Sequence, residues 1–382
     1  MFIISRPSLA FYINELIIIS ISQHENISTL NRTFVHYYSI LMKEREHKKV
    51  VAAITHGDVN GIGYEVILKA LADSRLLDFC IPVIYGNSKA ASYHRKTITA
   101  SDYQLTLTRD LAQLKAGKVY IVNIVNDEIK IEFGKSDRVA GQLAHKALED
   151  AISDINNGMA DILVTAPINK SNIQSETYNF PGHTEFLAKK YKAEDYMMLM
   201  VSPEIRIGVV TGHIPITEVP GTLTKELIEK KIKILHHSLK TDFGISSPKI
   251  AVLGLNPHAG DNSLLGNEEK NTIEPAILKS FENHINAFGP FPADSFFSTS
   301  AYREFDAILA MYHDQGLIPF KIMAFEEGVN FTAGLPIVRT SPAHGTGFDI
   351  AGKNLASCNS FRNALLLGAE IFQNRLKAAE KK

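Results

Sequence analysis

Residues 50–71 read VVAAITHGDVNGIGYEVILKAL, and this stretch carries the pattern that decides the fold. It opens with a short apolar, valine-rich run over residues 50–54, which is typical of a buried β-strand. It then passes through Gly57, Gly61 and Gly63 and continues at helical spacing over residues 65–71. A strand, a glycine-rich turn and a helix in this order form the building unit of an α/β protein.

The same alternation continues along the chain. Further strands are predicted over residues 81–85, 119–122, 161–165, 205–211, 249–254 and 307–311. Further helices are predicted over residues 141–156, 225–239, 268–282 and 361–377. Because strands and helices alternate, we expect an α/β fold with a largely parallel sheet.

The composition excludes some classes of protein. The 382 residues are 45% hydrophobic, and 40 lysines and arginines nearly balance 41 aspartates and glutamates. This balance gives no overall field that would draw the chain to nucleic acid or to an anionic membrane. The chain has two cysteines, Cys80 and Cys358, so we do not expect a disulfide framework. We expect the protein to be in a reducing compartment, the cytoplasm.

Residues 1–48 differ from the rest of the chain. They contain the apolar run LIIISI at residues 16–21, which is too short to span a bilayer. The features of a signal peptide are not clear in this segment either. We therefore treat residues 1–48 as an N-terminal extension outside the fold.

Histidines follow three of the predicted strands. His213, His258 and His313 come directly after the strands at residues 205–211, 249–254 and 307–311. Open α/β sheets bind ligands at the carboxyl ends of their strands, and three imidazoles with one open position suit a catalytic divalent metal. The chain has 14 histidines, however, and spacing alone leaves open that the three serve separate purposes.

Two aspartates and two polar residues before a helix are further candidates. Asp294 and Asp314 have the chemistry to orient an imidazole or accept a proton, although a helix cap or turn is an equally good explanation. His183 and Thr184, in PGHTEF, stand where they can hydrogen-bond a small polar ligand. The alternative is that Thr184 caps the helix.

Three later polar residues suit an anionic ligand. Lys321, Asn330 and Arg339 follow the His313 strand and can bind a carboxylate or a phosphate. Taken singly, a lysine or an arginine is more often a solvated surface residue.

Two glycine-rich segments can approach a cofactor. Residues 57–63 let backbone amides approach an anion at a helix start, although they match neither the Walker loop nor the dinucleotide GxGxxG spacing. A tight strand-to-helix turn explains them equally well. Residues 344–353 contain His344 and Gly345 and include Asp349, a carboxylate suited to ribose hydroxyls, but they also fit an ordinary loop.

Seven motifs together resemble the 4-hydroxythreonine-4-phosphate dehydrogenase (PdxA) family of vitamin B6 synthesis. They are THGDVNGIGYE, PGHTEFLA, TGHIPI, GLNPHAGDNSLLGNEE, PADS, MYHDQGLIPFK and GLPIVRTSPAHGTGFDIAGK. The resemblance runs in the family's order from about residue 50 to the C-terminus. HGTGFDIAGK and HGDVNGIGYE are also similar to loops of isopropylmalate and isocitrate dehydrogenases.

The resemblance implies a fold and a set of roles. It implies the two-lobed α/β/α fold of isocitrate and isopropylmalate dehydrogenases, which we divide into a cofactor lobe (49–178 plus 317–382) and a metal and dimerisation lobe (179–316). It implies a homodimer whose site draws on both chains, NAD or NADP, and one divalent ion, zinc, magnesium or cobalt. The implied metal ligands are His213, His258 and His313.

The other implied roles fall into three groups. Substrate contacts are His183, Thr184, Lys321, Asn330 and Arg339. We assign catalysis to Asp294 and Lys321. Cofactor contacts are Gly57, Gly61, Gly63, His344, Gly345 and Asp349.

The chain departs from the family at four places. His56 and Tyr64 stand where prolines are usual, Val59-Asn60 replaces Pro-Ala, and Gly347 replaces alanine. These departures bear on the cofactor loops and leave every proposed metal and substrate residue in place.

The expected reaction is NAD(P)-dependent oxidation of 4-phosphooxy-L-threonine to a 3-oxo acid, which loses carbon dioxide to give 3-amino-2-oxopropyl phosphate. One alternative is a dehydrogenase for a four-carbon sugar-acid phosphate such as threonate or erythronate 4-phosphate. The others are a metal-dependent hydrolase of phosphate esters and a non-catalytic metabolite-binding protein.

Overall fold

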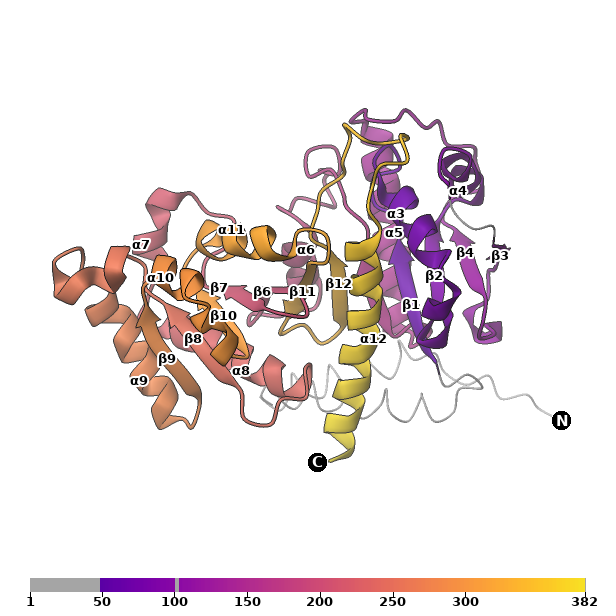
Figure 1. Cartoon of the computed structure of the whole chain (residues 1–382). Coiled ribbons are helices and arrows are strands. Elements are labelled where there is room, and N and C mark those ends of the chain that lie inside the picture. Colours follow the sequence, from indigo (N-terminus) through magenta and orange to yellow (C-terminus); the bar gives the residue numbers. More distant parts are fainter. Residues whose placement is uncertain (1–48, 100–102, 382) are drawn as a thin grey trace.

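The computed structural model describes residues 49–99 and 103–381 (Figure 1). The predicted N-terminal extension, residues 1–48, lies outside the described residues. Within the described part, twelve strands form one sheet in the order β3-β4-β2-β1-β5-β12-β11-β6-β7-β10-β8-β9. In the same residues, no helix combines the length and the apolar character needed to cross a membrane.

The strands are β1 (Val50–Thr55), β2 (Cys80–Gly86), β3 (Leu105–Leu107), β4 (Val119–Asn123), β5 (Ile162–Thr165), β6 (Met197–Val201), β7 (Arg206–Val209), β8 (Lys249–Leu253), β9 (Asn286–Phe291), β10 (Ala307–Ala310), β11 (Val329–Ala333) and β12 (Val338–Pro342). The α-helices are α3 (Gly63–Leu71), α4 (Ser88–Arg95), α5 (Arg138–Asn156), α6 (His183–Lys190), α7 (Val219–Thr222), α8 (Lys225–Thr241), α9 (Glu274–Glu282), α10 (Ala293–Ser298), α11 (His313–Ala324) and α12 (Asn359–Glu380). Short helical turns are η1 (Ser74–Asp78), η2 (Leu111–Gln113), η3 (Ile216–Glu218), η4 (Pro257–Ser263), η5 (Glu269–Ile273) and η6 (Ala301–Glu304).

The sheet has two parallel sections joined by an antiparallel centre. On one side β3, β4, β2, β1, β5 and β12 run parallel to their neighbours, and on the other side β7, β10, β8 and β9 do so. Between them β11 pairs antiparallel with β12 and β6, and β6 pairs antiparallel with β7. The predicted α/β fold with a largely parallel sheet is confirmed. The predicted lobe boundaries stay a prediction.

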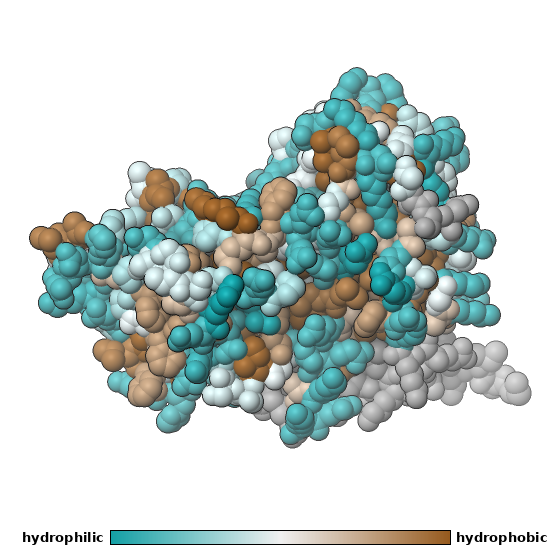
Figure 2. Space-filling model, viewed as in Figure 1, coloured by the Kyte–Doolittle hydropathy of each residue, from teal (hydrophilic) through white to brown (hydrophobic). Residues whose placement is uncertain are grey.

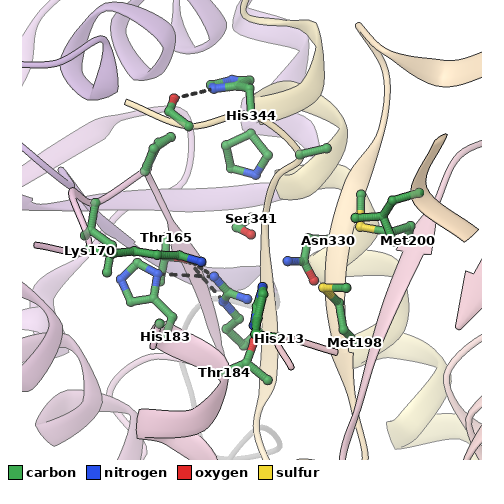
Figure 3. Close-up of a pocket in the computed structure, with 18 of the residues that line it drawn as sticks. Thr165, Lys170, His183, Thr184, Met198, Met200, His213, Asn330, Ser341 and His344 are labelled. Atoms are coloured by element: carbon green, nitrogen blue, oxygen red, sulfur yellow. Dashed lines mark hydrogen bonds between the residues drawn. The ribbon is translucent and has the colours of Figure 1, made fainter. Parts of the chain in front are cut away.

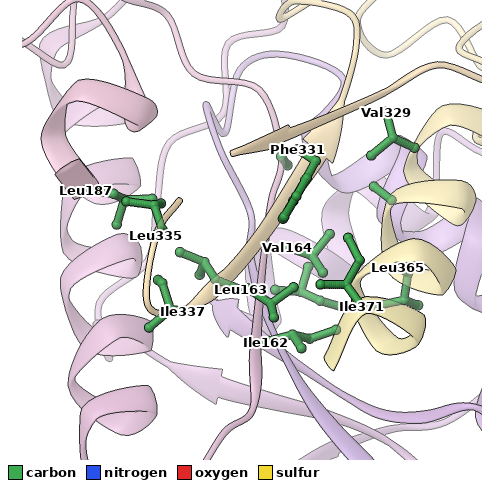
Figure 4. Close-up of a cluster of buried hydrophobic side chains, with 14 of the residues drawn as sticks. Ile162, Leu163, Val164, Leu187, Val329, Phe331, Leu335, Ile337, Leu365 and Ile371 are labelled. Atoms are coloured by element: carbon green, nitrogen blue, oxygen red, sulfur yellow. The ribbon is translucent and has the colours of Figure 1, made fainter. Parts of the chain in front are cut away.

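The core at the middle of the sheet forms between β5, β11, β12 and α12. Figure 4 shows Ile162 and Val164 of β5 beside Leu365 and Ile371 of α12. The buried residues of α12 recur every three or four positions, so one face of the helix packs on the sheet. All six residues of β1 are buried, which explains its continuous apolar sequence.

The predicted elements are present. For three elements that were not predicted, a physical reason explains why the sequence pattern did not indicate them. The seven predicted strands occur with ends shifted by at most two residues, and the predicted helices occur at the expected places. The predictions missed β11 and β12, which carry Asn330, Thr332 and Arg339 and so lack a continuous apolar run. They also missed α11, which has Gly316 and Pro319 inside it.

Gly316 shows why α11 tolerates a weak helix former. A Cβ at this position would lie 2.8 Å from Cγ2 of Ile207 and 3.1 Å from Cβ of Ala310. The missing side chain therefore lets α11 pack directly on β7 and β10. Tertiary packing outweighs helix propensity here.

A buried aromatic stack supports the turn between β1 and α3. The rings of His56 and Tyr64 stack with centroids 5.2 Å apart, and Tyr64 lies 5.0 Å from His94. His94 bonds to the carbonyl of Val59 at 2.8 Å, and the hydroxyl of Tyr64 accepts from the amide of Asn87 at 2.8 Å. His56 and Tyr64 stand where the resemblance leads us to expect prolines. In this chain two stacked rings therefore occupy the positions of two conformationally rigid residues.

The same burial makes folding stability depend on pH. Desolvation, reinforced for His56 by the charge of His94, lowers the pKa of both imidazoles to about 4. Between pH 4 and the unfolded value near 6.5, the unfolded chain binds protons that the folded chain does not bind. Stability therefore rises with pH across this window and is lost as the pH falls through it.

We predict that His56→Phe weakens this pH dependence. Phenylalanine can still stack on Tyr64 but does not titrate, so the slope of the unfolding free energy should fall by up to about 1.4 kcal/mol per pH unit. Urea unfolding from about pH 4.5 to 7.5, roughly the span of the window, measures the slope. His284→Asn, at an exposed position, is the control and should leave it unchanged. An unaltered slope in His56→Phe would contradict the prediction.

Candidate active site

A pocket of about 240 Å³ opens at the antiparallel centre of the sheet, a size that suits a small metabolite. Its walls come from β5, β6, β11, β12, α6, α11 and the segments that follow β5, β7 and β12. In Figure 3, Lys170 and His183 lie on one side, Met198 and Met200 on the other, and His344 above. The pocket therefore collects segments that are far apart in the sequence.

The strand register explains which side chains reach this pocket. Met200, Asn330 and Ser341 are directly paired across β6, β11 and β12, and all three line the pocket. Arg339 lies two residues before Ser341 on β12 and points to the same face. The neighbouring Thr340 points to the opposite face, where its hydroxyl donates to the carbonyl of Ala364 in α12 at 2.7 Å.

Two of the three predicted metal ligands meet in the pocket. His213 follows β7, His313 begins α11, and their ring centroids lie 5.7 Å apart. Nδ1 of His213 is 3.3 Å from the carboxylate of Glu185, and Nδ1 of His313 is 2.7 Å from that of Asp314. Two imidazoles, each with a carboxylate at Nδ1, are the kind of donors that hold a divalent metal in proteins.

The structure does not bring His258 to this pair. His258 is exposed in η4 and does not line the pocket. Residues 258–262 all have positive φ, and the loop is held by Glu269, whose carboxylate accepts the amides of Leu255 and Asn256 at 2.7 Å. Within residues 49–99 and 103–381, no group of three histidine, cysteine, aspartate or glutamate side chains is placed to hold a metal.

All five predicted substrate residues line the pocket: His183, Thr184, Lys321, Asn330 and Arg339. They come from α6, α11, β11 and β12.

Arg339 is a buried cation without a buried counter-charge. It is 3% exposed, and its guanidinium donates to the hydroxyl of Thr165 at 2.8 and 3.2 Å. Burial lowers its pKa to about 10, although Tyr178 and Glu185 oppose this shift. No ion pair between Arg339 and a carboxylate occurs in the described part of the chain. A desolvated guanidinium held by hydroxyl groups is suited to an incoming anion.

His183 is held neutral beside this cation. Burial, followed by the charges of Arg339 and Lys170, lowers its pKa well below the ordinary value. The guanidinium of Arg339 can only donate, so Nδ1 of His183, 3.3 Å away, accepts and the ring hydrogen lies on Nε2. His183 can therefore donate a hydrogen bond to a ligand without carrying a charge.

The predicted cofactor glycines bring backbone segments together. A Cβ would lie 2.3 Å from the carbonyl oxygen of Pro167 at Gly57, 2.7 Å from that of Thr346 at Gly61, and 2.2 Å from that of His56 at Gly63. The amide of Ile62 also donates to the Thr346 carbonyl at 3.0 Å. Residues 57–63 and 344–353 therefore lie against each other.

The second of these segments also reaches the pocket. His344 and Gly345 line it, whereas Asp349 is exposed and does not. Of the predicted cofactor residues, the three glycines thus pack against backbone, His344 and Gly345 line the pocket, and Asp349 does neither.

Asp294, predicted to be catalytic, is not among the pocket-lining residues. It is exposed in the first turn of α10, where the partial positive charge of the helix N-terminus stabilises a carboxylate. Within one chain Asp294 therefore lies outside the pocket, and its role as the base stays a prediction.

Sequence analysis missed two charged residues of the pocket, Lys170 and Glu185. Lys170 follows the end of β5 by five residues, so the strand-end argument applied to the histidines also fits it. Burial raises the pKa of Glu185, but the contact with His213, the backbone amide of Glu185 and the charges of His213 and Lys170 lower it by more, so it lies below its usual value.

The chain is similar in sequence to known proteins. A family model described as pyridoxal phosphate biosynthetic protein PdxA matches residues 78–368. A relative from Bacteroides thetaiotaomicron, named 4-hydroxythreonine-4-phosphate dehydrogenase, is 50% identical over 331 residues, covering 86% of this chain and 91% of the relative. A relative from Cupriavidus necator, named D-threonate 4-phosphate dehydrogenase, is 37% identical and covers 85% of this chain and 98% of the relative.

A solved structure supports the fold. The crystal structure of 4-hydroxythreonine-4-phosphate dehydrogenase from Klebsiella pneumoniae matches with a TM-score of 0.75 and 32% identity, covering 86% of this chain and 99% of that one. On the family match and the 50% identity, the chain belongs to the PdxA family of pyridoxal phosphate biosynthetic proteins.

Proposed function

We propose that this protein is an NAD(P)-dependent dehydrogenase that oxidises 4-phosphooxy-L-threonine in the cytoplasm during pyridoxal phosphate synthesis. The product is a 3-oxo acid that loses carbon dioxide to give 3-amino-2-oxopropyl phosphate. The observation that carries the proposal is the buried guanidinium of Arg339, which faces a small pocket that also contains His213 and His313. Names of relatives at 50% and 41% identity support the same reaction.

The charges in the pocket suit the substrate. Among the described residues that line it are Lys170, Lys321 and Arg339 and one carboxylate, that of Glu185. The substrate has a phosphate and a carboxylate, and charge-assisted hydrogen bonds from lysine and arginine bind both groups. Arg339 and His183 bind one anionic end, and Lys321 contributes to anion binding and to stabilising charge at the reacting carbon.

His213 and His313 would hold one divalent cation, zinc, magnesium or cobalt. When bound, the cation supplies Lewis acidity to the substrate hydroxyl, and the nicotinamide accepts hydride. Asn330 and Thr184 orient the substrate from β11 and α6, and Met198 and Met200 provide an apolar wall. His344 and Gly345 belong both to the pocket lining and to the segment at residues 344–353, which supports entry of the cofactor from that side.

A second candidate substrate has a specific observation in its favour. Relatives from Cupriavidus necator and Oceanobacillus iheyensis, both 37% identical, are named D-threonate 4-phosphate dehydrogenase, the second as putative. Threonate phosphate has a hydroxyl group where 4-phosphooxy-threonine has an amine. A direct comparison of the two substrates decides between them.

We predict chelator-sensitive reduction of NAD or NADP by the purified protein with 4-phosphooxy-L-threonine. His213→Ala should lower kcat/KM by roughly 100-fold or more because it removes a metal ligand. His284→Asn, exposed and outside the pocket, is the matched histidine control. Absorbance of reduced nicotinamide and release of inorganic phosphate are followed together.

The outcomes separate the candidate functions. Faster reduction with D-threonate 4-phosphate would favour the sugar-acid substrate. Phosphate release without reduction would favour a hydrolase. Binding of substrate without turnover in any divalent metal would leave a metabolite-binding protein.

We propose that the third metal ligand, His258, comes from a second copy of this chain. His258 is exposed in η4, and Leu264, which ends this turn, is 77% exposed. On α11 the side chains of Ile318 and Ile322 are 57% and 80% exposed, Phe325 directly after it is 70% exposed, and Figure 2 shows hydrophobic surface over this helix. A homodimer would cover these apolar surfaces and bring His258 of one subunit to the pocket of the other.

We predict complementation between two inactive variants. When His213→Ala and His258→Ala proteins are unfolded together and refolded, half of the dimers should be mixed, and one of their two sites should be intact. Activity should therefore recover to about a quarter of the wild-type value. Each variant refolded alone is the control. An inactive mixture in which mass spectrometry detects mixed dimers would show that His258 does not act across the interface.

A further inference from the structure

Glu185 is the carboxylate among the described pocket-lining residues, and it lies in the first turn of α6. It is the third residue of the helix, and the preceding Gly182 provides no side-chain cap. A Cβ on Gly182 would lie 3.4 Å from Oε2 of Glu185, so the carboxylate turns back towards the helix start. An anion is favoured at this end of a helix by the backbone amides.

The two carboxylate oxygens have different surroundings. Oε1 lies 3.3 Å from Nδ1 of His213, whereas Oε2 is buried and does not reach solvent. A carboxylate that accepts from Nδ1 requires the ring hydrogen to be on that nitrogen, which leaves the lone pair on Nε2. Because Oε2 is buried and Oε1 is next to the imidazole, Glu185 is poorly placed to touch a substrate.

The other pocket histidine is arranged in the same way. Nδ1 of His313 lies 2.7 Å from Oδ1 of Asp314. The side chain of Asp314 is 68% exposed, whereas that of Glu185 is 25% exposed. Both rings thus present Nε2, but only the contact of Glu185 joins separate elements, α6 and the segment after β7.

We propose that Glu185 is a positioning residue that accepts the Nδ1 hydrogen of His213 and holds Nε2 of that ring as the metal-binding nitrogen. By doing so it fixes the histidine after β7 relative to α6, which carries His183 and Thr184. The metal-binding and substrate-binding sides of the pocket are therefore connected through one carboxylate. The inference rests on the proposed metal-dependent function.

Two substitutions of Glu185 separate the effect of its hydrogen-bond acceptor from the effect of its volume. Glu185→Gln keeps a side-chain oxygen that can accept from Nδ1, and Glu185→Met fills a similar volume without a comparable acceptor. Glu194→Ala, which changes an exposed glutamate outside the pocket, is the control. The full-length protein is titrated with Co²⁺ against a chelator, and the tautomer of His213 is read from nitrogen chemical shifts of the metal-free protein, assigned with His213→Gln.

The expected results differ between the variants. Glu185→Met should weaken Co²⁺ binding by about 10- to 100-fold, and Glu185→Gln should weaken it less, because outer hydrogen-bond partners of metal ligands have effects of this size. The control should bind as the wild type does. In the metal-free wild type, the hydrogen of His213 should be on Nδ1, and in Glu185→Met it should move largely to Nε2.

Two results would overturn the inference. One is the finding that His213 of the wild-type protein has its ring hydrogen on Nε2. This measurement does not depend on any variant being able to fold. The other is a folded Glu185→Met protein with unchanged Co²⁺ affinity. If the wild type binds no divalent metal, the proposed metal centre fails, but the tautomer measurement still tests the contact between Glu185 and His213.

Discussion

The pairing register of the three central strands is the constraint on which the pocket depends. Asn330 pairs with Met200 on one side and Ser341 on the other, so their side chains form one row across the sheet. The alternate residues, such as Phe331 and Thr340, point to the opposite face, where the core and α12 lie. A slip of one residue would turn Asn330 and Arg339 into that core and bring apolar side chains into the pocket.

Register also explains how the chain accommodates a buried cation. The guanidinium of Arg339 lies among hydroxyl groups from two other strands, Thr165 on β5 and Thr332 on β11. Together with Nδ1 of His183, these hydroxyl groups accept hydrogen bonds from the guanidinium without neutralising its charge, which leaves an electrostatic preference for an anion. The same charge helps to keep His183 neutral. One buried residue therefore influences both the affinity of the pocket and the protonation of its neighbour.

The glycine-rich segments illustrate a different constraint. At Gly57, Gly61 and Gly63 a side chain would collide with the carbonyl oxygens of Pro167, Thr346 and His56, so only Gly61 is required by packing of the two glycine-rich loops on each other. Gly57 is required by the close approach of the segment after β5, and Gly63 by the tight turn itself. Beneath them, His56 stacks on Tyr64 where prolines are usual in the family resemblance. The turn is thus stiffened by a buried ring stack. Its cost is a loss of folding stability at low pH, because the buried His56 and His94 must stay neutral.

The sequence by itself determined the α/β class, most strand and helix positions, and the residue types of the pocket. Strand ends marked His213 and His313 because an apolar run and the residues directly after it are local features. The family motifs added His183, Thr184, Lys321, Asn330 and Arg339, all of which line the pocket. Strands β11 and β12 of the antiparallel centre were missed because they have polar residues facing the pocket, which removes the apolar signal of a buried strand. The apolar β6 was also missed, and this reason does not apply to it.

Only the tertiary structure decided which of these residues meet. Asp294 and Asp349 fit their sequence motifs but lie outside the pocket, whereas Lys170 and Glu185 enter it without having been predicted. The contact of Glu185 with His213 joins residues 28 positions apart, through α6 and the segment after β7. Distances of this kind depend on how elements pack and pair, and local sequence patterns carry no information about them.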